Sequence, residues 1–166
     1  MNVKNKRVVL DVNVWFSIFR NDNLRLIRSF VARNTTLLRS QLLERELERV
    51  LKDKEFRWRK PIELYLRFFY NFTVPIPTVS IFKDCRDPDD NYLFDLAIQT
   101  KADYLVSGDG DVLATPIPPP TKVISYTQFK EMFEIQKPLL NDKKPSQKSQ
   151  GFLDWLKKDL AKFFKK

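Results

Sequence analysis

Arg7-Val-Val-Leu-Asp11, near the start of the chain, is a β-branched apolar run that ends at a carboxylate. A run of this kind, bounded by a polar residue, is typical of a buried strand. Ala102-Asp-Tyr-Leu-Val-Ser107 repeats the pattern and leads into Gly108-Asp-Gly-Asp111. We therefore expect two buried strands, each with an aspartate just beyond its carboxyl end.

Helical patterns separate these two strands. They cover residues 14–32 with a break at 21–23, residues 41 to about 52 after Ser40 as N-cap, roughly 62–71, and about 88–100 after the cap Asp87-Pro88. Short strands are expected at 36–38 and 122–125, a connection or edge strand around Pro75 and Pro77, and a last helix from about 127 to 133. Strands that alternate with helices predict an α/β fold with a central parallel sheet flanked by helices.

The composition narrows the chemistry. The chain has no histidine, which excludes Ser-His-Asp and Cys-His catalysis and the commonest zinc sites. The single cysteine, Cys85, cannot form an internal disulfide, and nothing near the start resembles a signal peptide. We therefore expect a cytoplasmic protein. No apolar run approaches the roughly 20 residues that a membrane-spanning helix needs.

The charge is divided unevenly along the chain. The formal net charge is +9, and the stretch from Lys137 to the end holds nine Lys and three Asp, so six of the nine excess charges lie there. We expect a domain at residues 1–136, a polar linker at 137–151 and a basic amphipathic helix at 152–166. A basic protein of this kind favours a polyanionic partner, nucleic acid before anionic lipid.

The predicted helix after Ser40 carries three glutamates that point in different directions. At about 100° per residue Glu46 falls on the side of the apolar stripe, whereas Glu44 and Glu48 fall on the opposite side. A carboxylate turned toward the core costs several kcal/mol unless it is paired or binds a cation. Glu46 therefore needs a partner, either a cation or one of the arginines Arg39, Arg45 and Arg49.

The same test applied to the helix after Asp87 selects Asp90. The apolar stripe of that helix consists of Leu93, Phe94, Ala97 and Ile98. Asp90 lies in the middle of this stripe, Asp95 points away from it, and Asp87 serves as the cap. Asp90 is the second inward carboxylate, although it could also serve the helix dipole alone.

With the two aspartates beyond the strand ends, four acidic residues are expected to converge at one edge of the sheet: Asp11, Glu46, Asp90 and Asp109. Like charges in a cleft ionise together only with cations between them. Oxygen ligands without His or Cys suit Mg²⁺ or Mn²⁺. Two simpler roles stay open, because Asp11 could form a turn or a helix cap and Asp109, between glycines, could form a turn.

Four motifs in order resemble the PIN-domain family, and within it the VapC-like toxins of toxin-antitoxin systems. They are Val8-Val-Leu-Asp11-Val-Asn13, Ser40-Gln-Leu-Leu-Glu-Arg-Glu46-Leu, Arg86-Asp-Pro-Asp-Asp90-Asn and Ala102-Asp-Tyr-Leu-Val-Ser-Gly-Asp109. The resemblance covers residues 7 to about 133, roughly four-fifths of the chain. Val12 departs from the pattern, since a small polar residue is more usual between Asp11 and Asn13.

The resemblance implies a PIN-like fold and an Mg²⁺- or Mn²⁺-dependent endoribonuclease. By position it makes Asp11, Glu46, Asp90 and Asp109 the catalytic and metal-binding residues. Asn13 and Ser107 would orient the metal ligands or water. Asp111 would add to the site or belong to the following turn. RNA is the implied substrate, an antitoxin protein the implied partner, and a homodimer is common in such proteins.

The tail and two other functions remain open. The apolar face of residues 152–164 would dock on its own chain, on a partner subunit or on an anionic membrane surface, and its lysines could instead contact RNA or a protein. The alternatives to the enzyme are a catalytically weak PIN-like module that binds RNA or protein, and a membrane-associated scaffold that acts through the tail.

Overall fold

The computed structural model describes residues 5–53 and 57–134, with side chains up to Met132. Met1–Met132 form one compact unit, distinct from Phe133–Lys166. The predicted linker at 137–151 and tail helix at 152–166 lie outside the described residues. None of the described helices is long and apolar enough to cross a membrane.

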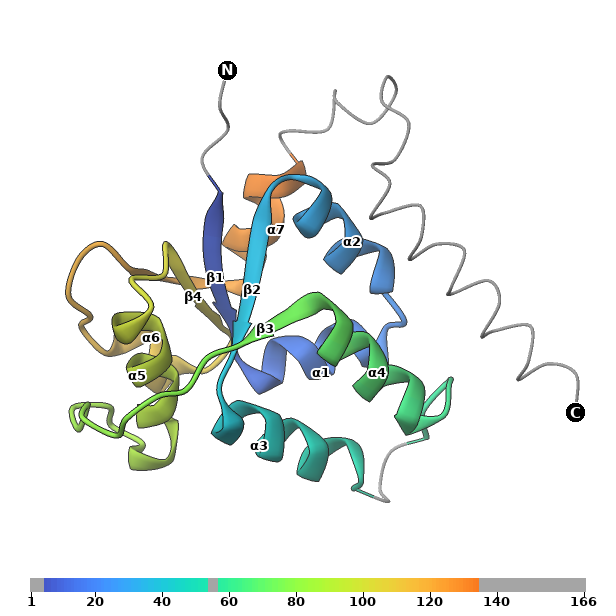
Figure 1. Ribbon diagram of the computed structural model, residues 1–166, viewed down its shortest axis with the longest axis horizontal. Coiled ribbons are helices and arrows are strands. Elements are labelled where there is room, and N and C mark those ends of the chain that lie inside the picture. The colour runs from blue at the N-terminus through green and yellow to red at the C-terminus, as the bar shows by residue number, and fades with distance from the viewer. Residues whose placement is uncertain (1–4, 54–56, 135–166) are drawn as a thin grey trace, which may run out of the picture. The chain divides into compact units, whose positions relative to one another are not determined.

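A five-stranded sheet forms the centre of the first unit (Figure 1). Its strands are β1 (Lys6–Leu10), β2 (Thr35–Arg39), β3 (Thr73–Pro75), β4 (Tyr104–Ser107) and β5 (Lys122–Ser125). Their order in the sheet is β3-β2-β1-β4-β5, and every neighbouring pair is parallel. The predicted parallel α/β fold is confirmed. The first and fourth strands are neighbours, so the residues that follow them share one edge of the sheet.

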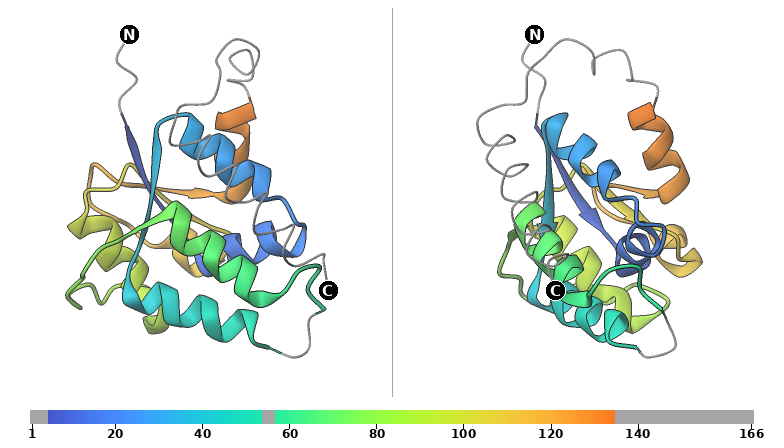
Figure 2. Two further views of the ribbon diagram at one scale, coloured as in Figure 1. Left: turned by 45° about the vertical axis from the view of Figure 1, so that its right-hand side comes forward. Right: turned by 90° about the vertical axis from the view of Figure 1, so that its right-hand side faces the viewer.

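Helices connect the strands and cover the sheet on both sides (Figure 2). They are α1 (Val12–Arg20), α2 (Leu24–Ala32), α3 (Gln41–Leu51), α4 (Ile62–Phe72), the 3-10 turn η1 (Pro88–Asp90), α5 (Asn91–Gln99), α6 (Gly110–Ala114) and α7 (Tyr126–Glu134). Only α6 is new with respect to the expectation from sequence. It is five residues long, too short to produce a periodic pattern.

Two helix starts follow the predicted capping chemistry. The Ser40 hydroxyl accepts a hydrogen bond of 3.3 Å from the Leu43 amide at the start of α3. Asp87 Oδ1 accepts one of 3.0 Å from the Asp89 amide, with Pro88 at the first helical position. These caps satisfy amides that have no partner inside the helix, and they fix where Glu46 and Asp90 stand on their helices.

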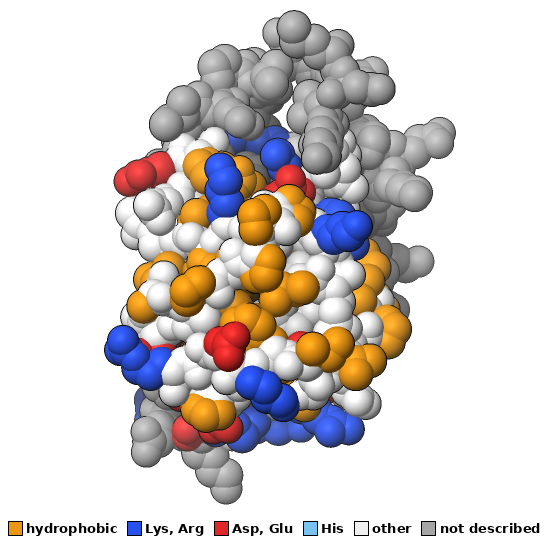
Figure 3. Space-filling view, turned by 90° about the vertical axis from the view of Figure 1, so that its left-hand side faces the viewer, with side chains coloured by type: hydrophobic (Ala, Val, Ile, Leu, Met, Phe, Trp, Pro, Cys, Tyr) orange, Lys and Arg blue, Asp and Glu red, His pale blue; other side chains and the backbone are white. Residues whose placement is uncertain are grey.

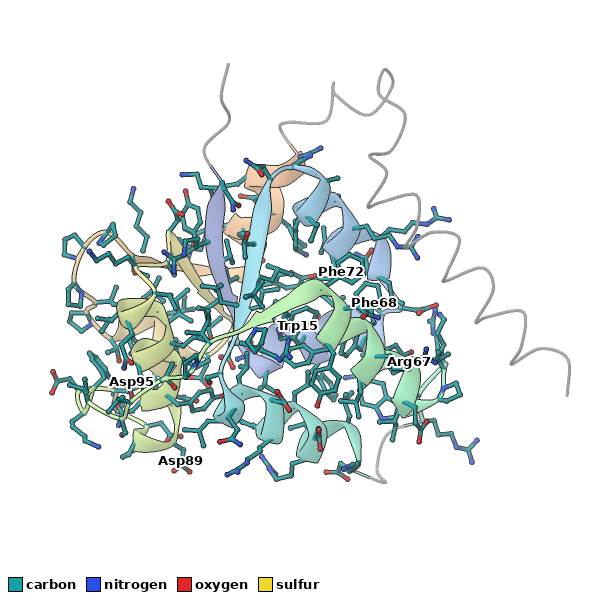
Figure 4. The ribbon with its side chains drawn as sticks, in the orientation of Figure 1. Trp15, Arg67, Phe68, Phe72, Asp89 and Asp95 are labelled. Carbon is teal, nitrogen blue, oxygen red and sulfur yellow. The ribbon has the colours of Figure 1, made fainter. Side chains whose placement is uncertain are left out.

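The core is rich in aromatic side chains, as the composition suggests. Trp15 of α1 packs edge-on against Phe69 of α4 with ring centroids 5.0 Å apart, and the ring of Phe19 lies 4.8 Å from that of Tyr65 in a tilted arrangement. Figure 4 labels Trp15 of α1 and Phe68 of α4, and Phe68 packs against Phe19 with ring centroids 6.3 Å apart. Because α1 follows directly after Asp11, this packing holds the carboxyl end of β1 in place.

The open edge beyond β3 is closed to further pairing by proline. The Ile76 amide donates to the Arg39 carbonyl of β2 at 2.8 Å, so the neighbouring residue, Pro75, faces away from β2. Proline has no amide hydrogen to offer there, which is a common protection of an edge strand. The edge position of this strand is one of the two alternatives that its prolines indicate.

Candidate active site

The carboxyl ends of β1 and β4 bring Asp11 and Ser107 together. The Asp11 amide donates to the Val106 carbonyl at 2.9 Å, which continues the sheet one residue past β1. The Asp11 side chain is only 5% exposed, and its Oδ2 accepts a hydrogen bond of 2.6 Å from the Ser107 hydroxyl. Ligands of open parallel sheets bind at such a point, where the strand order reverses.

Asn13 fixes this pair from the first turn of α1. Its Nδ2 donates to Asp11 Oδ2 at 2.7 Å and to the Ser107 hydroxyl at 3.2 Å. Its Oδ1 accepts from the Gly108 amide at 3.0 Å, so it also holds the chain that leaves β4. Both oxygens of a carboxylate can accept hydrogen bonds, and Asn13 and Ser107 both donate to the same oxygen of Asp11, Oδ2. These two residues therefore contact Asp11 directly, as a supporting role requires.

Asp109 stands beside this group and caps a helix at the same time. Its amide donates to the Ser107 hydroxyl at 2.9 Å, and its Oδ1 accepts from the Asp111 amide at 2.7 Å at the start of α6. The turn or cap role left open for Asp109 is thus present. Asp111 contacts Asp109 through its amide, and its carboxylate oxygen Oδ1 accepts a hydrogen bond of 2.9 Å from the guanidinium of Arg86.

Glu46 is held by a tyrosine rather than by an arginine. The hydroxyl of Tyr92, in the first turn of α5, donates a hydrogen bond to Glu46 Oε2. Arg39 instead pairs with Glu44 at 3.2 Å, and within the described residues no ion pair includes Glu46. The sequence analysis missed Tyr92, although its place two residues after Asp90 puts it near the same site.

The electrostatics of Asp90 show that the carboxylates act on one another. Burial raises the pKa of Asp90 to about 7, together with the negative charges of Asp11, Asp87, Asp109 and Glu46. A like charge disfavours ionisation only when it lies close by, so the four predicted site residues share one region of the molecule. Asp87, predicted only as a cap, adds a fifth negative charge to it.

The pKa values of Asp11 and Tyr92 are both raised above their ordinary values. Burial raises the pKa of Asp11, the charge of Glu46 adds to this effect, and the hydrogen bond from Ser107 opposes it. Burial also raises the pKa of Tyr92, and its bond to Glu46 and the charges of Asp11 and Asp90 act in the same sense. Tyr92 therefore stays protonated and remains a hydrogen-bond donor at neutral pH.

The donor set fits a hard divalent cation that keeps part of its water. All four residues offer carboxylate oxygens, which Mg²⁺ and Mn²⁺ prefer. Within residues 5–53 and 57–134, no three His, Cys, Asp or Glu side chains stand close enough to surround an ion by themselves. Mg²⁺ is commonly bound by one or two carboxylates with waters in the other positions, so the residues present fit it.

One buried acid belongs to the scaffold and not to the site. Asp95 of α5, which is predicted to point away from the apolar stripe, is nevertheless only 4% exposed. Its Oδ1 accepts bonds of 2.9 Å from both the Ile81 and Phe82 amides (Figure 4 labels Asp95). The loop before α5 covers this face of the helix, and a helical period cannot reveal such a cover.

The sequence matches the family model of the PIN domain over residues 7–111, more than half of the chain, a range that includes all four predicted site residues. No curated protein matches the chain significantly. PIN domains are generally nucleases and generally use divalent metal ions. With its parallel sheet and its carboxylates at the ends of β1 and β4, the chain belongs to the PIN-domain family.

Proposed function

We propose that this protein is an endoribonuclease that hydrolyses RNA phosphodiester bonds with Mg²⁺ or Mn²⁺. The observation that carries the proposal is the gathering of acids beyond the adjacent strand ends of β1 and β4, where burial and the charges of Asp11, Asp87, Asp109 and Glu46 raise the pKa of Asp90. Neighbouring carboxylates repel one another when they are ionised, and a divalent cation bound between them relieves this repulsion. In a nuclease, such a cation would assist the cleavage of the phosphodiester bond.

Each residue has a distinct task in this proposal. Asp11, Glu46, Asp90 and Asp109 would hold the cation, one or two of them directly and the others through its bound waters. Ser107 and Asn13 keep the Asp11 carboxylate in one orientation, and Tyr92 does the same for Glu46. A bound cation lowers the pKa of water and stabilises the charge that develops on phosphate oxygens.

The test is cleavage of an end-labelled RNA of mixed sequence by the purified protein. We expect cutting with Mn²⁺ or Mg²⁺, none with chelator, and a loss of at least about 100-fold in Asp11→Asn, since that variant keeps the shape and removes the charge. Asp89→Asn is the matched control, because Asp89 is an exposed neighbour of Asp90 that is absent from the charges raising the pKa of Asp90. Cleavage by Asp11→Asn at the normal rate would refute the assignment.

A single-stranded DNA of the same sequence tests the preference for RNA. RNA is favoured in the proposal by the resemblance of the four motifs to VapC-like ribonucleases. The absence of cutting in any metal by folded protein would favour the alternative of a binding module. Equal cutting of the DNA would correct the substrate class while leaving the nuclease proposal intact.

We also propose that the ribonuclease acts as a toxin restrained by an antitoxin protein. The support is again the motif resemblance. Induced expression of the chain alone should stop growth, while Asp11→Asn expressed to the same level should not. Normal growth with active, soluble enzyme present would refute the toxin role without touching the nuclease activity.

A further inference from the structure

The helix α3 separates its charges onto different sides. Glu44 accepts from Arg39 at 3.2 Å and from the Tyr70 hydroxyl at 3.2 Å. Glu48 accepts from the same hydroxyl at 2.6 Å and from Lys52 at 3.3 Å. Both acids thus contact Tyr70 of α4, and within the described residues neither forms an ion pair with the other two arginines, which lie on α3 itself.

Those other arginines are Arg45 and Arg49. Both are exposed, and within the described residues neither takes part in an ion pair. Glu46, which lies between them in sequence, is bound to Tyr92 instead. The helix therefore presents two cations to solvent while each of its three acids is engaged elsewhere.

Their positions on α3 flank that of Glu46, one residue before it and three residues after it. Arg45 and Arg49 are four residues apart, so they lie on one stripe with a rise of about 6 Å between them. Leu42, 47% exposed, lies on the same stripe. Glu46 is separated from Arg49 by about 60° around the helix and faces the carboxylate group. The stripe is thus the solvent-exposed margin of the element that carries Glu46.

Charged side chains of both signs lie on the surface of the protein. Figure 3 shows Lys and Arg side chains at several places on one face, among them its lower margin, where Asp or Glu side chains also lie. Hydrophobic side chains are spread over the middle of the same face. A cationic margin beside an acidic site is an arrangement that would hold a polyanion next to the carboxylates without bringing its charge onto them.

We propose that Arg45, Arg49 and Leu42 form a docking stripe for the backbone of single-stranded RNA. The inference rests on the proposed function and extends it to how the substrate is held. Arginine matches phosphate geometry with paired N–H donors, and two arginines one helical turn apart can contact successive phosphates. Leu42 offers an apolar contact to a base or ribose. A protein partner is a different occupant, which the experiment below would reveal.

The experiment measures binding of a fluorescent single-stranded RNA of mixed sequence by anisotropy, in chelator so that no cleavage occurs. Arg45→Gln/Arg49→Gln is compared with Lys101→Gln/Lys122→Gln, which removes the same charge at the amino ends of β4 and β5, the opposite edge of the sheet. We expect the arginine double variant to bind at least about 5-fold more weakly. Its slope of log K against log salt should fall by about 1.4, since each phosphate contact contributes about 0.7 for a single strand.

Three outcomes would overturn the proposal. They are equal weakening in both double variants, no weakening in the arginine variant, and no RNA binding by the native protein. Arg45→Lys/Arg49→Lys should recover part of the affinity, and circular dichroism should show unchanged folding, because both side chains are exposed. Binding in chelator is independent of cleavage, so RNA that binds to the stripe but is not cut would fail the nuclease proposal alone.

Discussion

The hydroxyl of Tyr92 on α5 donates a hydrogen bond to Glu46 on α3, and so it joins two helices that carry candidate-site acids. Asp90 stands two residues before Tyr92, at the start of the same helix. The bond therefore ties the position of Glu46 to that of Asp90. Arg39, one of the arginines predicted as a possible partner of Glu46, is engaged with Glu44 and the β3 residue Thr73.

Tyr92→Phe should weaken cation binding while leaving the fold in place. The substitution keeps the ring and removes one hydrogen bond to a charged group, which contributes about 1.5 to 3 kcal/mol. We expect the cation concentration for half-maximal cleavage to rise about 10- to 150-fold, since each step of about 1.4 kcal/mol corresponds to a factor of ten. A titration of cleavage rate against Mn²⁺ at saturating RNA measures this.

Tyr70→Phe is the matched control for Tyr92→Phe. It removes a hydroxyl that bonds Glu44 and Glu48 on the other side of α3. It should lower the melting temperature but leave the cation midpoint unchanged. Equal shifts of the midpoint in both variants would show that Tyr92 acts only through general stability.

Asp90 should make the cation-free protein less stable as the pH rises. Its pKa is raised from 3.8 to about 7 in the folded state, so the folded form binds the proton more tightly than the unfolded form. Well below pH 3.8 Asp90 is protonated in both the folded and the unfolded form, so it causes no loss of stability there. Between about pH 4 and pH 7 the unfolded form alone ionises, so the penalty grows and is complete above pH 7.

Asp90→Asn removes this penalty and should raise the melting temperature in chelator at about pH 8 by roughly 4 °C for each kcal/mol regained. At pH 4 the variant and the native protein should melt alike. Added Mg²⁺ should stabilise the native protein more at pH 8 than at pH 5, and should stabilise the variant less. Melting curves by differential scanning fluorimetry decide this; a native protein that is most stable at pH 8 in chelator would contradict it.

Ser107→Ala should move the acid limb of the activity profile to higher pH. The Ser107 hydroxyl donates to Asp11 and lowers the pKa of that carboxyl, so its loss leaves burial and Glu46 less opposed. A stability loss of about 1 to 3 kcal/mol accompanies it, since the Asp109 amide also loses its acceptor. The measurement is cleavage rate against pH.

Ser107→Thr is expected to restore the native pH profile, because threonine keeps the hydroxyl and suits a strand. An alanine variant that is slower at every pH by the same factor would contradict an effect on Asp11. It would point to misplacement of the strand end instead.

Asp95→Ala should destabilise the fold without changing the site. It removes the acceptor of the Ile81 and Phe82 amides, which costs about 2 to 4 kcal/mol when a charged acceptor is lost. Chemical denaturation measures the loss, and the cation midpoint should remain native. Asp89→Ala, at an exposed position, should change stability by less than about 0.5 kcal/mol. A near-native unfolding midpoint for Asp95→Ala would refute the scaffold role.

Several features of this protein follow from the sequence alone. The apolar runs that end at Asp11 and Ser107 mark the two buried strands, and Ser40 and Asp87 mark helix starts. Helical periodicity turned Glu46 and Asp90 inward. These inferences succeed because strand burial, capping and helical facing depend on residues a few positions apart, whose geometry is nearly the same in every fold.

Tertiary structure decided how those pieces meet. The Asp11–Ser107 bond spans 96 positions and exists because the strand order puts β1 beside β4. The Tyr92–Glu46 bond and the burial of Asp95 beneath a loop likewise depend on elements that no local period relates. The sequence by itself determined which residues are candidates for the site, and only the packing of distant segments decided which hydrogen bonds and neighbouring charges set their orientation and pKa.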